Sequence, residues 1–549
     1  LYERDAAGRV TRETLKLNSV DFSEKTATWD LLGRLVSETD ELGRATSYAY
    51  AEDASSCTTT ETVTLPSGAT RVTKTHADGT VLLEAGTSRR GVETLVDFVS
   101  DGVRATRRLA GTTEDSGILF RRITNGFGEE IRTGTPNTLG GFIYLRKTYD
   151  ARGLLVRSAT DGLAPELYEY DAFGDETKRT LALAENPSAS NSRIRETETF
   201  YETREDGVYR VSSEKTYAAS GAAITTETAF LVSESATLES KTVSKDARGN
   251  ASARWTEFGE PGVRLSKTQM PGVTNIAQST TNDGFTVSQV DHAGTQTTFA
   301  RNYYAGENAR IELTTTDGRG NATLVVQNVL GWTTKTVDAA GNSTTTAYDL
   351  AHGKPSCVTD ALGKTHRFAY DLRGNVAAEF GTGALPAVFA YDAADRKISQ
   401  KLFRAESASA ETDPRSRTDG DETQWEYHEA TGLLLSKTYP DESRVDYAYD
   451  AHNRLSSTTL AREVSPGVRL KLTRAYAPLT GELVSLSSND GNGEATPPSV
   501  NETWVYDFLG RLVSRTDSSG ATSYQYDEYG ALSEETKSGG LFVPTKTLT

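Results

Sequence analysis

Polar and apolar residues alternate along short stretches of this chain, and turn-forming residues separate the stretches. Typical stretches are 344–348, 444–449 and 522–526, which are rich in Thr, Ala, Val and Tyr. Residues two positions apart lie on the same face of a β-strand, so Tyr524 and Tyr526 predict a strand with one aromatic face. No stretch keeps a 3.6-residue period beyond a turn or two. The pattern therefore predicts an all-β chain.

The separating groups form a repeat. A Tyr-Asp dipeptide, usually followed by x-x-Gly, recurs with its aspartates often 20 to 22 residues apart, and a second Asp-x-x-Gly often falls midway, as at Asp338 and Asp360. Each step of 10 to 11 residues is one strand plus one turn. The clearest structural turn motifs are formed by Tyr149, Asp150 and Gly153, by Tyr170, Asp171 and Gly174, by Tyr370, Asp371 and Gly374, by Tyr506, Asp507 and Gly510, and by Tyr526, Asp527 and Gly530.

Asp and Gly have separate roles in such a turn. Asp is favoured at the first position of a type I turn, because its carboxylate accepts hydrogen bonds from backbone N–H groups two residues on. Gly, three residues later, adopts the left-handed conformation that closes a short hairpin loop with a bulge. Aromatic residues on neighbouring strands would stack as a ladder, with cross-strand pairs worth about 0.2–1 kcal/mol each. We therefore predict a repeat array of consecutive antiparallel β-hairpins.

The array is interpreted as one continuous domain over residues 1–549. Repeats are clear at about 28–50, 148–180, 315–400 and 500–537, and degenerate at about 51–125 and 195–245, where strands are expected to persist without the dipeptide. Long loops are predicted at about 184–193, 404–422 and 488–499. Periodicity resumes after each loop, so we interpret the loops as decorations on one array and not as interdomain linkers.

Composition favours a fold that exposes much of its surface. Hydrophobic residues make up 36% of the chain, and its 47 glycines raise the apolar share to about 45%, the low edge of the globular range. No apolar run approaches the length of a membrane span, so no membrane insertion is expected. The net charge is −17 without a clustered basic face, which disfavours nucleic acid as a partner. Cys57 and Cys357 form no CxxC pair and leave the compartment open.

No group of residues predicts catalysis, so we expect no enzyme, no cofactor and no metal site. The motif aspartates recur once per turn and do not pair in a shared pocket, which favours turn formation over acid–base chemistry. The six histidines include no HExxH motif and no close pair. A metal site assembled across neighbouring repeats stays open. The loops at 317–321 and 490–494 lack a full set of calcium ligands and are interpreted as glycine turns.

The motif Tyr-Asp-x-x-Gly-Arg, followed by Leu or Val and a polar strand, resembles the YD repeat of bacterial Rhs proteins. Related repeats occur in shell-forming subunits of insecticidal ABC toxin complexes and in animal teneurins, and residues 506–527 are especially similar to that consensus. The resemblance covers most of the chain. It implies a β ribbon that winds as a spiral into a hollow shell, which in toxin members encloses a C-terminal effector. The expected fold class is therefore an all-β partial hollow shell.

The chain differs from toxin-type shells at the features that deliver an effector. Its one Asp-Pro pair, Asp413-Pro414, lies in a polar loop without the glycine of the family's self-cleavage signature. The resemblance implies a stretch of shell wall whose partners are the rest of its parent chain, an enclosed cargo or effector domain, or a shell-closing protein. It also implies a secreted or cell-surface bacterial protein. The alternative is a surface adhesion module that binds a glycan or a protein.

The length of the ribbon sets the size of this partial shell. At about 10.5 residues per strand the chain holds at most roughly 50 strands, and at about 4.8 Å per strand the ribbon measures roughly 200–250 Å. Closed as a single turn, it would be wide enough for a folded domain of 100–200 residues. It is too short to stack several turns and seal both ends. We therefore expect an open, curved ribbon around a wet concavity.

Overall fold

A computed structural model describes residues 1–112, 117–233, 235, 237–404, 410–489, 500–539 and 545–547. Within these residues it holds 45 strands and one short 3-10 turn, η1 (Pro414–Ser416). Each strand pairs antiparallel with the next one along the chain, from β1–β2 through to β44–β45, and all belong to one sheet. Neither end strand pairs with the other in the described part of the chain. The predicted all-β array of consecutive hairpins is confirmed.

The ribbon is described below as two courses. The first course comprises β1 (Tyr2–Arg4), β2 (Val10–Leu17), β3 (Val20–Trp29), β4 (Leu35–Thr39), β5 (Ala45–Asp53), β6 (Thr58–Thr64), β7 (Thr70–His76), β8 (Val81–Ala85), β9 (Val92–Val99), β10 (Gly102–Leu109), β11 (Ile118–Thr124), β12 (Glu130–Pro136), β13 (Phe142–Tyr149), β14 (Leu155–Thr160), β15 (Glu166–Tyr170), β16 (Glu176–Leu181), β17 (Arg193–Arg204), β18 (Gly207–Tyr217), β19 (Ala223–Leu231), β20 (Leu238–Lys245), β21 (Ala251–Phe258), β22 (Val263–Gln269), β23 (Ala277–Asn282) and β24 (Phe285–Val290). The second course comprises β25 (Gln296–Tyr304), β26 (Arg310–Thr316), β27 (Ala322–Gln327), β28 (Thr333–Val337), β29 (Ser343–Asp349), β30 (Lys354–Thr359), β31 (Thr365–Tyr370), β32 (Val376–Phe380), β33 (Ala387–Tyr391), β34 (Lys397–Leu402), β35 (Asp421–Tyr427), β36 (Leu434–Thr438), β37 (Arg444–Tyr449), β38 (Leu455–Ser465), β39 (Val468–Tyr476), β40 (Leu483–Asn489), β41 (Asn501–Tyr506), β42 (Leu512–Asp517), β43 (Gly520–Tyr526), β44 (Leu532–Ser538) and β45 (Thr545–Thr547).

The two kinds of turn lie on opposite rims of the ribbon. Successive turns of an antiparallel ribbon alternate between its two rims. Every Tyr-Asp turn joins an odd-numbered strand to the next even-numbered one, as Tyr149-Asp150 does between β13 and β14. The midway turns, such as the one that begins at Asp338 between β28 and β29, join even to odd strands. We call these two edges the Tyr-Asp rim and the opposite rim.

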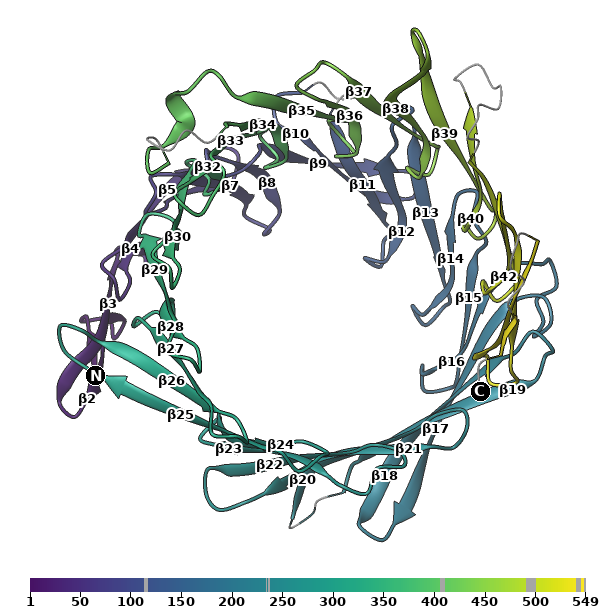
Figure 1. The fold of residues 1–549 in the computed structure, drawn as a ribbon, viewed down its shortest axis with the longest axis horizontal. Coiled ribbons are helices and arrows are strands. Elements are labelled where there is room, and N and C mark those ends of the chain that lie inside the picture. Colours follow the sequence, from purple (N-terminus) through teal and green to yellow (C-terminus); the bar gives the residue numbers. More distant parts are fainter. Residues whose placement is uncertain are drawn as a thin grey trace.

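The ribbon closes on itself as a spiral of nearly two courses around an empty centre (Figure 1). Contacts between the courses join residues 279 positions apart, as in Arg248 to Asp527, and up to 339 apart, as in Arg90 to Glu429. The partial hollow shell is thus confirmed, but the expectation of a single turn of ribbon is wrong. That estimate took the whole ribbon as one circumference and left out contacts between rims, which stack the second course on the first.

The two faces of the wall differ in their side chains. Thr345, Thr359 and Thr365 are directly opposed on neighbouring strands and therefore share a face. The Thr365 hydroxyl donates to Glu411, which lies in the segment of η1, and η1 lies on the outer side of the ring (Figure 1). This face is the outer one. The alternate residues, including Thr346 and the motif tyrosines, therefore face the lumen.

The part of the wall that the structure describes has no solid core. Its accessible surface is 31053 Å², whereas a compact monomer of 59.4 kDa would expose roughly 19,000 Å². One cluster of buried residues, Tyr209, Val211 and Ala229, lies within β18 and β19. A ribbon that is wet on both faces explains the excess of exposed surface.

The long loops differ partly from their predicted bounds. The first spans 182–192, and Ser192, which precedes β17, is fully buried. In the second, the described residues fold back on the wall, where Asp413 caps η1 and Pro414 is buried, so the Asp-Pro pair does not lie in a solvated loop. In the third, Ser488 and Asn489 belong to β40, and 490–499 lie outside the described residues. Strands continue through both degenerate regions, as β6–β11 and β17–β20.

Candidate functional site

The hairpin turns are held by a regular set of backbone and carboxylate contacts, which the turn at Asp150 illustrates. The N–H of Gly153 donates to the Asp150 carbonyl at 3.0 Å, and the N–H of Asp150 donates to the Leu154 carbonyl at 2.9 Å. The Asp150 carboxylate accepts from the N–H of Arg152 at 2.8 Å and of Leu154 at 3.0 Å. The Leu154 N–H is the main cause that lowers the pKa of this carboxyl from its ordinary value of 3.8. Asp therefore binds a second N–H beyond the one expected from sequence.

The other sequence-predicted turn residues occupy the same positions. Asp171, Asp371, Asp507 and Asp527 each accept from the N–H groups two and four residues on. The fourth turn residues are Gly174, Gly374, Gly510 and Gly530, and all have positive φ. Tyr170, Tyr370, Tyr506 and Tyr526 each end a strand at a register shift.

Motif tyrosines such as Tyr149, Tyr170, Tyr370 and Tyr526 fasten their hairpins to the strand beside them. The hydroxyl of Tyr170 donates to the Leu155 carbonyl at 2.8 Å, and that of Tyr526 donates to the Leu512 carbonyl at 2.7 Å. Tyr149 and Tyr370 donate in the same way to the carbonyls of Glu130 and Pro355. The tyrosine thus satisfies a backbone carbonyl where the bulge interrupts the ladder of hydrogen bonds.

Sequence reasoning missed the role of the arginine that follows the glycine. The Arg511 guanidinium binds the Asp507 carboxylate, with Nε 2.8 Å from Oδ2, and lies 4.3 Å from the Tyr526 ring centroid. The same pairing with aspartate occurs at Arg9, Arg34 and Arg44. It also occurs at Arg396 and Arg454, which follow Asp395 and Asn453 in place of the glycine. Arg9 also donates from Nη1 to the Asp30 carbonyl of the following repeat. The recurring Gly-Arg dipeptide was the available signal for this contact.

The aromatic ladder on the luminal face differs from its prediction, because cations stand between the rings. Arg179 lies directly opposite Tyr168 and 4.9 Å from its ring centroid. Burial raises the pKa of Tyr168 to about 12, and its hydrogen bond to Glu166 adds to the rise. The repeat is two strands long, so an aromatic strand alternates with a strand that carries Arg or Lys. Lys397 of β34 lies 5.5 Å from the Phe389 ring centroid of β33 and 4.5 Å from the Trp425 ring centroid of β35, so this cation bridges rings of two successive repeats.

A seam joins the opposite rim of the first course to the Tyr-Asp rim of the second course. Arginines of the first course supply most of the charged contacts. Arg193 donates from Nε to the Phe508 carbonyl at 2.9 Å and pairs with Glu482 at 2.5 Å. Arg248 pairs with Asp527 at 2.6 Å, and Arg44 lies 4.7 Å from the Trp332 ring. These first-course guanidinium groups thus reach from the opposite rim of the first course to the Tyr-Asp rim of the second course.

Amide side chains lock the middle of the seam in both directions. Asn453 donates from Nδ2 to the Pro136 carbonyl at 3.0 Å, and its Oδ1 accepts from the N–H of Thr138 at 3.1 Å. Asn137 donates to the Ala451 carbonyl at 3.1 Å. These bonds fix the register of the two courses, because each amide needs its partner turn directly opposite.

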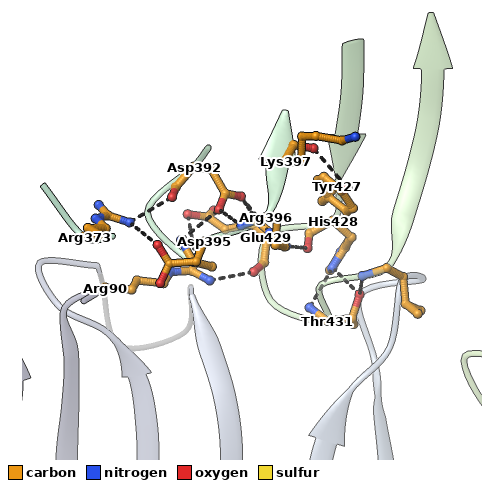
Figure 2. A network of polar contacts seen from close by, with 12 residues as sticks. Arg90, Arg373, Asp392, Asp395, Arg396, Lys397, Tyr427, His428, Glu429 and Thr431 are labelled. Carbon is orange, nitrogen blue, oxygen red and sulfur yellow. Dashed lines mark hydrogen bonds and ion pairs between the residues drawn. The ribbon is translucent and has the colours of Figure 1, made fainter. Parts of the chain in front are cut away.

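Figure 2 shows the seam where it is densest in charge. Arg90 of the first course donates to the Glu429 carbonyl at 3.1 Å and pairs with its carboxylate at 3.4 Å. Burial lowers the pKa of Arg90. Within the second course, Arg373 donates to the Asp392 carbonyl and Arg396 donates to the His428 carbonyl. The guanidinium groups tie three turns of the Tyr-Asp rim to each other and to the course beside them.

Ligand chemistry is sparse in the part of the chain that the structure describes. No group of three or more His, Cys, Asp or Glu side chains there lies close enough to hold a metal ion. The loop at Asp317 is a turn closed by the N–H groups of Arg319 and Asn321, as expected, and 490–494 lie outside the described residues. No helix among the described residues is long and apolar enough to cross a membrane.

Comparisons with known proteins match the repeat and the fold. The RHS Repeat family matches residues 428–463 and 506–541. The chain aligns over 100% of its length with the crystal structure of TcdB2-TccC3-Cdc42, at 12% identity and a TM-score of 0.54, covering 36% of that chain. The crystal structure of TcdB2-TccC3-TEV aligns at 11% identity and a TM-score of 0.35, covering 40% of that chain. No curated protein matches the sequence.

The fold and its repeated turns define a class of protein: a wall built from one spiral β ribbon around a hollow interior. The chain matches the RHS Repeat family over two stretches and is similar in fold to the solved TcdB2-TccC3-Cdc42 chain. It spans well under half of the length of the solved chains that it matches.

Proposed function

We propose that this chain is shell wall that encloses a polypeptide cargo, within a larger secreted or surface Rhs protein. The single observation that carries the proposal is the hollow course of the ribbon, with its 31053 Å² of accessible surface. A wall that exposes both of its faces to solvent suits a shell, because one face can meet the surrounding solution while the other meets the enclosed polypeptide. We propose that residues 1–549 act as one continuous array, with no enzymatic step of their own.

The family resemblance suggests the contents and the partners. In toxin members the shell holds a C-terminal effector, and the matched TcdB2-TccC3-Cdc42 structure covers a chain far longer than this one. We infer that the partners are the rest of the parent chain, an enclosed effector or a shell-closing protein. Toxin delivery follows for the parent protein if the enclosed part is an effector.

A pair of neighbouring threonines tests which face meets the contents. Thr346 faces the lumen, and Thr345, one residue earlier, faces outwards, so Thr346→Cys and Thr345→Cys place the same thiol on the two sides of the wall. The native thiols are first removed as Cys57→Ser and Cys357→Ser. The probe is an unfolded polypeptide, reduced and carboxymethylated lactalbumin carrying a maleimide, at equal concentrations for both variants.

A shell that receives polypeptide couples more of the probe at Thr346→Cys than at Thr345→Cys, corrected for the rate of each thiol with a small maleimide. Equal coupling, or a preference for Thr345→Cys, overturns the proposal. A preference for the outer thiol would favour the adhesion module instead.

A further inference from the structure

One face of the sheet from β17 to β21 carries a row of directly opposed residues that runs across the strands. Tyr201 of β17 lies opposite Arg210 of β18, which lies opposite Phe230 of β19. The row continues through Thr242 of β20 to Arg254 of β21. We call these five residues the aromatic–arginine row. Its strands β17, β18, β20 and β21 lie together at the lower side of the ring (Figure 1).

The aromatic–arginine row continues the luminal face of the wall. Tyr168 of the luminal face lies opposite Arg179, and Arg179 lies opposite Arg195 of β17. Arg195 and Tyr201 are six positions apart on one strand, so their side chains share a face. The row is therefore on the face where a shell meets its contents.

The rings and the cations of the row are both exposed. Tyr201 is 68% exposed and Phe230 is 47% exposed. Arg210 and Arg254 are exposed as well, and neither guanidinium has an ion-pair or hydrogen-bond partner among the residues that the structure describes. Elsewhere on this face a cation is engaged, as Arg179 is by a carboxylate and a ring. Exposed aromatic and arginine side chains are the types enriched in protein interfaces.

The charge of this face fits an anionic partner. The neighbouring cations are compensated, since Arg264 pairs with Glu239 at 2.7 Å and Arg195 lies 3.6 Å from Glu214. The two arginines of the row are not compensated in this way. The chain as a whole carries a net charge of −17, so the row is a local positive site in an acidic protein. Complementary charge selects the partner and fixes its register.

We propose that the aromatic–arginine row binds an acidic, extended segment of the enclosed polypeptide, an inference that rests on the proposed function. Three strand spacings separate Arg210 from Arg254, which is roughly 14 Å. Side chains four residues apart on an extended peptide point the same way and lie roughly 13 Å apart. A peptide that crosses the strands therefore places one carboxylate on each guanidinium, in charge-assisted hydrogen bonds. An apolar side chain between the two acids meets Phe230.

The spacing defines the segment as acidic-x-apolar-x-acidic, and fluorescence anisotropy with the full chain tests it. The probe is a short fluorescein-labelled peptide that contains Glu-Ser-Leu-Ser-Glu. A second peptide carries Lys in place of each Glu, and a third has the same composition as the first with its two Glu adjacent. The wild-type chain should bind the first peptide roughly ten-fold more tightly than either of the others, and added salt should weaken the binding.

Two pairs of substitutions locate the site. Arg210→Ser with Arg254→Ser should abolish the preference for the first peptide. Lys215→Ser with Lys245→Ser is the matched control, because these lysines pair with glutamates on the other face of the same sheet. The control removes the same charge and should keep the preference.

Charge reversal guards against a loss that is due to misfolding. Arg210→Glu with Arg254→Glu should switch the preference to the lysine peptide, a result that a misfolded variant would not give. Equal binding of the acidic and lysine peptides by the wild-type chain overturns the proposal, as does equal weakening by the lysine control. Binding of oligothymidine or polygalacturonate without binding of the acidic peptide also overturns it, because the ligand would then not be polypeptide.

The peptide test and the test of the proposed function fail separately. If the peptide shows no preference, the coupling of polypeptide at Thr346→Cys still reports on the shell, because that position lies on a different strand. If coupling is equal at Thr346→Cys and Thr345→Cys, the shell proposal falls, whereas the effect of the arginine substitutions on peptide binding is still measured.

Discussion

A turn glycine that combines positive φ with close neighbours is the residue least open to change. Gly374 has φ +86°, and a Cβ there would lie 3.3 Å from His352 Cδ2 and from Lys354 Nζ. Gly174 has φ +94°, but its nearest neighbour would be Leu154 at 3.7 Å. We expect Gly374→Val to lower the melting temperature more than Gly174→Val, because a β-branched residue resists this backbone region and crowds the seam-side turn as well.

Asp371→Ala gives the comparison with a lost side-chain cap. We expect it to cost about 1 kcal/mol, less than either glycine change, by analogy with other capping residues. Gly126→Val is the control, since Gly126 lacks positive φ and has open space around its Cα. Equal and negligible losses for the Asp and Gly variants in thermal unfolding would contradict the turn assignment.

The arginine after the glycine makes a second prediction at this scale. Arg511→Lys keeps the charge but loses the planar group that binds Asp507 and stacks on Tyr526. We expect a loss of about 1 kcal/mol in the free energy of unfolding, because Lys cannot reproduce both contacts. Arg319→Lys is the control, since Arg319 is exposed on the opposite rim of the second course. No difference between the two variants in urea unfolding would show that the stacking contributes nothing.

The sequence predicted the turns well because their chemistry is local. Asp150 and Gly153 act through backbone groups within four residues, and such contacts follow from residue type. The tyrosine hydroxyls and Arg511 act across one repeat, and periodicity alone does not say which carbonyl or ring they meet. The strands of the degenerate regions followed from alternation without the dipeptide.

At the scale of strands and rims, acid should loosen the whole ribbon at once. The pKa of Asp150 is lowered in the fold, mainly by the Leu154 N–H, and that of Asp317 mainly by Asn321. A carboxyl whose folded pKa is lowered adds stability that is fully present above its ordinary value of 3.8 and is lost as pH falls through the folded value. Stability should therefore be flat near neutral pH and fall below about pH 4.

Urea unfolding at about pH 7, 5 and 3 measures this dependence. Asp150→Asn is the control, because the wild-type turn at Asn125 uses an amide in the same position. The variant should keep the turn and lose its share of the pH dependence. A stability that rises between pH 5 and 3 would contradict the assignment of the aspartates.

The seam could not be predicted from the sequence, because it depends on which turns meet after about 300 intervening residues. Asn137 and Asn453 each resemble ordinary turn residues, and nothing in their own repeats marks them as partners. Counting the turns along the sequence does show which are odd and which are even. This alternation correctly assigns each turn to one of the two rims. The circumference of the ring was not available, and that length alone decides which turns lie opposite one another.

Removing one seam amide should weaken the contact between courses without unfolding the ribbon. Asn453→Ala leaves the Pro136 carbonyl and the Thr138 N–H without their partner, and we expect a cost of about 1–3 kcal/mol. A cycle with Asn137→Ala should show coupling of at least about 0.5 kcal/mol, because both amides join the same two turns. Asn342→Ala, which removes a turn contact on the opposite rim of the second course, is the control.

Hydrogen exchange resolves the outcome of that cycle. In Asn453→Ala the amides of 137–141 should exchange faster, while those of the Asp338 turn should not change. Faster exchange throughout the chain would mean that the courses do not separate as units.

For the whole molecule, small-angle scattering should report the empty centre. A compact chain of this length would have a radius of gyration of roughly 24 Å. A ribbon of two courses around a lumen should give a clearly larger value, with pair distances skewed towards the diameter of the ring. A value near that of a compact globule, or the profile of a straight rod, would contradict the shell.

The seam also sets an order of events during synthesis. Each strand pairs with its immediate predecessor, so the ribbon can grow strand by strand as the chain emerges. The seam, however, joins residues 279 to 339 positions apart, which at ribosomal rates of 5–20 residues per second means a delay of roughly 15–70 s. The first course therefore stands alone for that time and serves as the template on which the second course is laid. A change that prevents the first course from folding removes the template. A change that affects only the second course leaves the template intact.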